Sequence, residues 1–106
     1  MKKYITLVQY NELNGKEKKA LIEWWNKTQG TLGSPLRVPI LNIGQMIEFL
    51  GWEDMQFYKI AKHAKGTNKR EWNKWVVQNG DYENASIAFQ GDELCDALWK
   101  GVKENV

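Results

Sequence analysis

Apolar residues recur at three- and four-residue spacing between Gly15 and Thr28, a pattern that is typical of an amphipathic helix. Asn14 precedes this stretch and Glu17 follows three residues later, which is the spacing of a reciprocal capping pair. Gly30 lies just beyond the stretch, where a helix ends readily. We therefore predict a helix over 15–28. Its predicted apolar stripe consists of Ala20, Leu21, Trp24 and Trp25.

The end of the chain has a second helical pattern, in the stretch "GDELCDALWKGVKEN". Asp92 and Glu93 stand at its start, where the helix dipole favours carboxylates. We predict an amphipathic helix that covers a sheet. Its apolar face consists of Leu94, Leu98 and Val102 at four-residue spacing, broadened by Cys95 and Trp99.

Two shorter segments also have capping signals. In "NIGQMIEFLG", Asn42 is the expected cap, Gln45 stands at the third helical position and Gly51 lies just past the end. We predict a short helix there, apolar over much of its surface. In "YITLVQYNEL", the β-branched and aromatic residues suit a strand, whereas Thr6 as a cap before Leu7 suits a short helix. We choose the short helix.

The middle of the chain predicts strands. The runs "QFYKIAK" and "REWNKWVVQ" flank a connection of Gly, Thr and Asn, and the turn Asn79-Gly80-Asp81 precedes "ASIAFQ". Strand alternation then sends Trp75 and Val77 inward. The expected fold class is α+β, with N-terminal helices, a three-stranded antiparallel meander and a C-terminal helix packed on the sheet. A mostly α fold stays open, because Phe57 and Ile60 also fit a helical stripe.

Length and composition limit the class of protein. A chain of 106 residues suits a single domain, residues 1–106, and 42% hydrophobic with 26% charged residues is ordinary for a globular protein. The N-terminal apolar run is too short for a signal peptide, and no run reaches the roughly 18 residues of a membrane span. Cys95 is the single cysteine, which excludes an intramolecular disulfide and fits a reducing cytosol. We expect a cytoplasmic protein.

The candidate chemistry is sparse. His63 is the single imidazole, so a nucleophilic pair with Cys95 requires that folding brings two distant residues together. Cys95 lies on the apolar face of the last helix, where a free cysteine is usually a small buried hydrophobe. The carboxylates of Asp92, Glu93 and Asp96 suit the helix dipole without any metal ion. Nucleotide-binding and metalloprotease motifs are absent from the sequence. We expect no catalytic residue, no cofactor and no metal.

The strongest charge signal is the basic segment, residues 59–74, with six cations and one carboxylate for a net charge of +5. Residues 81–106 have a net charge of −4, so the molecule could have one basic and one acidic end. A single-stranded nucleic acid suits this segment if Trp72 stacks a base. Alternatively, the lysines protect an edge strand from aggregation. The candidate residues for binding a partner or nucleic acid are Lys59, Lys62, Lys65, Lys69, Arg70, Trp72 and Lys74.

Three blocks of the chain, "EWW", "LNIGQMIEFLG" and "ELCDALWKGVK", resemble small accessory proteins encoded by phages and prophages of Gram-positive bacteria. The matching residues are 43–50, an "IGQMIEFL"-like block, and 93–103, an "ELxDALWxAVK"-like helix. Gly101 replaces the alanine that is usual in that helix, which should weaken it by roughly 0.5–1 kcal/mol. The resemblance implies a phage context and no particular reaction.

These observations together favour a protein that binds and does not catalyse. The expected function is stoichiometric binding to a host or phage protein, with a host defence nuclease such as a CRISPR effector among the targets. The alternative is a single-stranded nucleic-acid-binding protein that uses the basic segment. The sequence does not predict the oligomeric state or whether the basic segment or the acidic C-terminal helix forms the interface.

Overall fold

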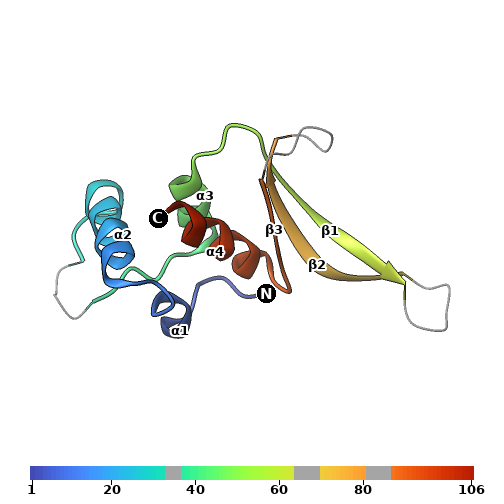
Figure 1. Ribbon diagram of the computed structural model, residues 1–106, viewed down its shortest axis with the longest axis horizontal. Coiled ribbons are helices and arrows are strands. Elements are labelled where there is room, and N and C mark those ends of the chain that lie inside the picture. Colours follow the sequence, from blue (N-terminus) through green and yellow to red (C-terminus); the bar gives the residue numbers. More distant parts are fainter. Residues whose placement is uncertain (33–36, 64–69, 81–86) are drawn as a thin grey trace.

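Helices and sheet occupy different parts of an elongated molecule of 53 × 28 × 21 Å (Figure 1). The computed structural model describes residues 1–32, 37–63, 70–80 and 87–106, and for 60–63, 70–73 and 87 it describes the backbone alone. The elements are α1 (Leu7–Tyr10), α2 (Gly15–Thr28), α3 (Ile43–Leu50), β1 (Met55–His63), β2 (Arg70–Asn79), β3 (Ile87–Gly91) and α4 (Leu94–Asn105). In Figure 1, α2 lies at one end, the β1–β2 hairpin at the other and α4 between them.

The predicted helix starts are confirmed. Asn14 caps α2, with its side chain accepting from the Glu17 amide and the Glu17 side chain accepting from the Asn14 amide. The same reciprocal pair opens α3 at Asn42 and α1 at Thr6. Gly51 ends α3 in the left-handed conformation with φ +59°, which a glycine adopts at little cost. The short-helix interpretation of the N-terminal segment is therefore correct.

The sheet is a three-stranded antiparallel meander in the order β1-β2-β3, so the α+β prediction is confirmed and the mostly α alternative is wrong. The β1–β2 pairing runs from Met55 opposite Asn79 to His63 opposite Arg70, with a register shift between Ile60 and Ala61. β3 pairs with only five residues of β2, 75–79. At residues 70–74 of β2, the described sheet consists of β1 and β2 alone. We call residues 60–63 with 70–74 the hairpin arm.

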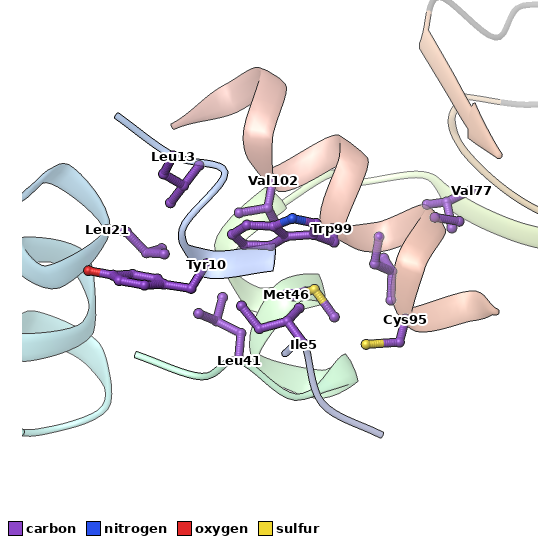
Figure 2. Packing of buried hydrophobic residues seen from close by; sticks show 12 residues of the cluster. Ile5, Tyr10, Leu13, Leu21, Leu41, Met46, Val77, Cys95, Trp99 and Val102 are labelled. Atoms are coloured by element: carbon purple, nitrogen blue, oxygen red, sulfur yellow. The ribbon is translucent and has the colours of Figure 1, made fainter. Parts of the chain in front are cut away.

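The core forms where α4 packs on the sheet and on the N-terminal helices. Trp99 lies at its centre with 1% of its surface exposed, and its Nε1 donates to Glu12 Oε1 at 2.9 Å. Figure 2 shows Trp99 among side chains from α1, α3 and the segment before α3. Val77 is buried and Trp75 packs against the same cluster, as strand alternation predicts. The buried residues of α4 are Cys95, Ala97, Leu98, Trp99, Gly101 and Val102.

One residue of the predicted apolar stripe of α2 is wrong. Ala20 is exposed, whereas Leu21 is buried and Trp24 and Trp25 pack half-buried against the core. The reason is that α2 lies at the end of the molecule, so only one side of it, with Leu21, Trp24 and Trp25, packs against the core.

The described part of the acidic stretch 81–106 does not form an end of the molecule, and residues 81–86 lie outside the described residues. Asp92 and Glu93 precede α4, which packs on β2, β3 and α3 and lies in the middle of the molecule (Figure 1). The end opposite the hairpin is formed by α2 (Figure 1), in which Lys16, Lys19 and Lys27 are exposed. Within the described ranges, no helix has the length and apolar character that crossing a bilayer requires.

Candidate functional site

The basic segment spans the hairpin arm, which extends beyond the part of the sheet that β3 and α4 cover. Lys59 marks the border, since its strand partner Trp75 is the first residue of β2 that pairs with β3. Lys59 is exposed, and its Nζ lies 5.1 Å from the centroid of the Trp75 ring. A cation over an aromatic face is modestly stabilised at an exposed site. This lysine therefore partly covers the tryptophan at the base of the arm.

The described lysines of the basic segment do not share a face of the sheet. Lys59 and Trp75 are directly paired and project to the same side, whereas Lys74 is the neighbour of Trp75 and projects to the other. Lys74 Nζ forms an ion pair with Asp92 Oδ1 at 2.5 Å. This contact lowers the pKa of the Asp92 carboxyl below its usual range, chiefly through the hydrogen bond from Lys74. Lys74 is thus engaged within the molecule.

The remaining candidates are placed only in part. In the backbone register of the arm, Lys62 lies opposite Glu71, Arg70 opposite His63, and Trp72 opposite Ala61. Lys65 and Lys69 lie outside the described residues. The structure therefore brings five of the candidates onto one pair of strands: Lys59, Lys62, Arg70, Trp72 and Lys74. The side chains of Lys59 and Lys74 are described, and they lie on opposite faces of the sheet.

A nucleophilic pair of His63 and Cys95 has no support in the geometry. His63 ends β1 at the tip of the arm, whereas Cys95 is buried in the first turn of α4, well away from that tip (Figures 1 and 2). Burial raises the pKa of the Cys95 thiol to about 11, so the reactive thiolate is scarce at neutral pH. The part of the chain that is described contains no group of three His, Cys, Asp or Glu residues that could hold a metal ion.

The structure reveals a group of exposed hydrophobic residues that the sequence interpretation missed, near the N-terminus. Four large hydrophobic side chains are exposed there: Met1 at 79%, Tyr4 at 55%, Leu7 at 57% and Val8 at 77%. We call these four residues the N-terminal apolar surface. The other exposed large hydrophobic residue of the described ranges, Phe57, lies on β1. Because α1 is a single turn, no periodicity marked a buried and an exposed side, and high apolar content was the one available signal.

The backbone that carries this surface is firmly held. The Ile5 amide donates to the Leu41 carbonyl at 3.0 Å, and the Ile43 amide donates to the Lys3 carbonyl at 3.2 Å. These bonds flank a β-bridge between Tyr4 and Asn42. The Ile5 side chain is buried in the core next to Met46 (Figure 2). Residues 3–5 are therefore an extended segment fixed against the start of α3.

A polar network ties the same segment to α4. Asp96 Oδ1 accepts from Lys2 Nζ at 2.5 Å and from Gln9 Nε2 at 2.8 Å. Gln9 Oε1 accepts in turn from Lys2 Nζ and from the Thr6 amide, both at 2.9 Å. The Lys2 and Asp96 side chains are about a quarter exposed, so water screens their ion pair less than it screens one on the open surface. The network ties Lys2 and the start of α1 to α4.

Two surfaces are thus available for a partner, the basic segment around the arm and the N-terminal apolar surface. Comparisons of this chain with protein-family models, with curated proteins and with solved structures give no match. A function is therefore inferred from the residues of the chain and their geometry.

Proposed function

We propose that this chain is a small phage accessory protein that acts in the host cytoplasm by non-catalytic, stoichiometric binding to a host or phage protein. The similarity of residues 43–50 and 93–103 to phage-encoded proteins supports the phage context. The binding mode is supported by the N-terminal apolar surface, which is the observation that carries the proposal.

An exposed hydrophobic side chain is informative when its backbone is ordered. Scattered apolar residues on a surface are normal, and a fraying terminus exposes them at no cost. Here the segment is fixed by backbone bonds to residues 41 and 43 and by the Asp96 network, yet it presents Leu7 and Val8 to solvent. A held segment that keeps Tyr4, Leu7 and Val8 in water suits a protein interface, because a partner gains their burial without first ordering them.

The basic segment, residues 59–74, has a supporting role in this proposal. Its charge acts over a distance of about one Debye length, which is ~8 Å at physiological ionic strength, and speeds the encounter with an acidic partner. The apolar side chains then provide the contact area. A host defence nuclease such as a CRISPR effector is one target of this kind, since a small protein that covers a working surface inhibits without chemistry.

The test is affinity capture from infected host lysate with a C-terminally tagged chain. The wild type should retain one protein at a one-to-one ratio, and Leu7→Ser with Val8→Ser should lose it. Phe57→Thr is the matched control, because it also removes an exposed hydrophobic side chain but leaves the N-terminal segment intact. Equal capture by the wild type and the Leu7, Val8 variant, or no specific capture by either, contradicts the proposal.

Stoichiometric inhibition has a simple signature. When the captured protein is a nuclease, its activity should fall linearly with added chain and reach its floor at one equivalent. The inhibited fraction should not change with incubation time. Inhibition that grows with time at a small fraction of an equivalent would show turnover and would refute the non-catalytic part of the proposal.

Single-stranded nucleic-acid binding is the second candidate, favoured by the projection of the arm beyond the three-stranded part of the sheet. It requires affinity that falls steeply with salt, because counterions are released from the phosphates. Lys69→Ala with Arg70→Ala should weaken it, whereas Lys16→Ala with Lys27→Ala, an equal loss of charge on α2, should not. Equal weakening by both pairs, or no binding at low salt, excludes this function.

A further inference from the structure

A groove of about 640 Å³ lies beside α2, outside both surfaces described so far. One wall is the first half of α2, and another is the segment that contains Arg37 and Val38. Its size is within the range of about 300–1,000 Å³ that is usual for ligand sites. The lining residues are Tyr10, Asn11, Gly15, Lys18, Lys19, Ile22, Glu23, Arg37 and Val38.

The charge of the groove is mainly positive. Lys18, Lys19 and Arg37 line it against one carboxylate, that of Glu23. Lys18 is occupied, since its Nζ donates to Asn11 Oδ1 at 3.0 Å and lies 5.3 Å from the centroid of the Tyr10 ring. Lys19 and Arg37 are exposed and form no ion pair with any residue that the structure describes. Two cations are thus available to an anionic ligand.

The floor of the groove is apolar. Ile22 and Val38 are half-buried, and Tyr10 is buried with its ring directed toward α2 (Figure 2). A ligand that fits this lining has an apolar group for the floor and carboxylates for the rim. An acidic peptide segment that contains one large hydrophobic side chain has this composition.

We propose that the groove binds an acidic segment of the protein partner, with one hydrophobic side chain on the floor and carboxylates at Lys19 and Arg37. The proposal rests on the proposed function, because the groove adjoins the N-terminal apolar surface. Leu7 and Val8 begin α1, and Tyr10 and Asn11, which line the groove, stand at its end. One partner that contacts Leu7 and Val8 can therefore reach the groove as well.

A nucleic acid fits the groove less well. Single-strand binding needs exposed aromatic faces for stacking, whereas Tyr10, the one aromatic residue of the lining, is buried and has a lysine over its ring. The Glu23 carboxylate also repels phosphates but leaves room for a peptide, which has neutral backbone groups between its acidic side chains.

The experiment uses a short fluorescein-labelled peptide with glutamates on both sides of one phenylalanine, titrated with the full chain in a fluorescence anisotropy assay at low salt. The same peptide with glutamines in place of the glutamates is the charge control. The acidic peptide should bind and the glutamine peptide should not. A glutamine peptide that binds equally well, or an acidic peptide that does not bind, overturns the proposal. Displacement of the bound peptide by an unlabelled thymidine oligonucleotide overturns it in favour of nucleic acid.

Matched variants place the binding in the groove. Lys19→Ala with Arg37→Ala should weaken the acidic peptide at least about fivefold, since two exposed ion pairs are lost. Lys16→Ala with Lys27→Ala removes the same charge from exposed positions of α2 that do not line the groove, and it should leave the affinity within about twofold. Equal weakening by the two pairs would show a general charge effect and refute the groove.

The two proposals fail separately. Leu7→Ser with Val8→Ser should abolish partner capture and leave peptide binding unchanged. Peptide binding without any captured partner counts against the proposed function alone. Partner capture that persists without peptide binding counts against the groove alone.

Discussion

The N-terminal segment and α4 are in contact, and both are rich in large apolar residues. The two regions differ in the burial of these residues. In α4 the side chains of Leu98, Trp99 and Val102 have 1% or less of their surface exposed. In the N-terminal segment, Leu7 and Val8 keep more than half of theirs in water. Asp96 of α4 is bonded to Lys2 and Gln9, so the two regions form one joined structure.

This contrast shows that apolar content alone does not separate a core from an interface. A twelve-residue helix has a long side that packs against the sheet and α3, and its apolar residues fall on that side. The four-residue α1 is held mainly by backbone bonds at its flanks and by polar contacts, so its hydrophobic side chains need not face inward. Burial in α4 stabilises the fold, and exposure in α1 is available to a partner.

The contrast predicts the largest effect at Trp99. Trp99→Ala should lower the free energy of unfolding by about 3–5 kcal/mol, because it empties the centre of the core and removes the hydrogen bond to Glu12. Chemical denaturation measures this, with Lys100→Ala on the exposed side as the control, expected within about 0.5 kcal/mol of wild type. A Trp99→Ala protein as stable as wild type that has lost partner capture would reverse the roles of the two regions.

A smaller loss is expected at Gly91, where the sheet meets α4. A Cβ at this position would lie 2.7 Å from the Ala97 amide nitrogen and 3.1 Å from Asp96 Cβ. Gly91→Ala should therefore lower the free energy of unfolding by about 1–3 kcal/mol, as overpacking against backbone usually does. Gly15→Ala is the control, since a Cβ there meets nothing within 4 Å. Equal stability of the two variants would mean that α4 is free to shift on the sheet.

The link between the two regions is tested at Asp96. Asp96→Asn weakens the contacts to Lys2 and Gln9 and should lower the free energy of unfolding by about 1 kcal/mol. Hydrogen exchange of the Ile5 amide should become faster, because the N-terminal segment is held less firmly. Asp92→Asn, which removes an exposed ion pair with Lys74, should have a smaller effect on stability and none on Ile5. Unchanged exchange at Ile5 in Asp96→Asn would show that the network does not hold the segment.

A gain in stability is expected from a substitution at Gly101, on the buried side of α4. A Cβ there would lie 3.4 Å from Leu50 Cδ1 and from Phe89 Cδ2, a close but acceptable contact. Gly101→Ala should raise the free energy of unfolding by about 0.5–1 kcal/mol, since alanine loses less backbone entropy in a helix. A thermal melt measures the gain. A loss of stability would mean that the side chains of Leu50 and Phe89 cannot shift by the small distance that the added Cβ requires.

The smallest effect is expected on the exposed side of the comparison. Val8→Ser should leave the free energy of unfolding within about 0.5 kcal/mol of wild type, because the valine is 77% exposed and loses little burial. Denaturation of the variant beside Trp99→Ala gives the contrast directly. A loss above 1 kcal/mol would show that Val8 contributes to the core and would remove it from the proposed interface.

The sequence by itself determined the features that depend on a few neighbouring residues. The capping pairs at Thr6, Asn14 and Asn42 each close within three residues, so the helix starts were predicted correctly. The same holds for Gly51, where local backbone geometry requires a glycine. The strand runs likewise gave the meander, although the predicted connections at 64–69 and 81–86 lie outside the described residues, and the four-residue spacing in α4 gave its buried face.

Only the tertiary structure decided which surfaces meet and which remain in water. Lys59 and Lys74 lie on opposite faces because of the strand register, which the charge pattern does not contain. The groove joins residues such as Tyr10, Ile22 and Arg37, which are far apart in the sequence. The exposure of Leu7 and Val8 likewise depends on what packs beside α1. Burial is favourable for every hydrophobic side chain, but the packing of elements that are distant in the sequence determines which of these side chains are buried within the fold.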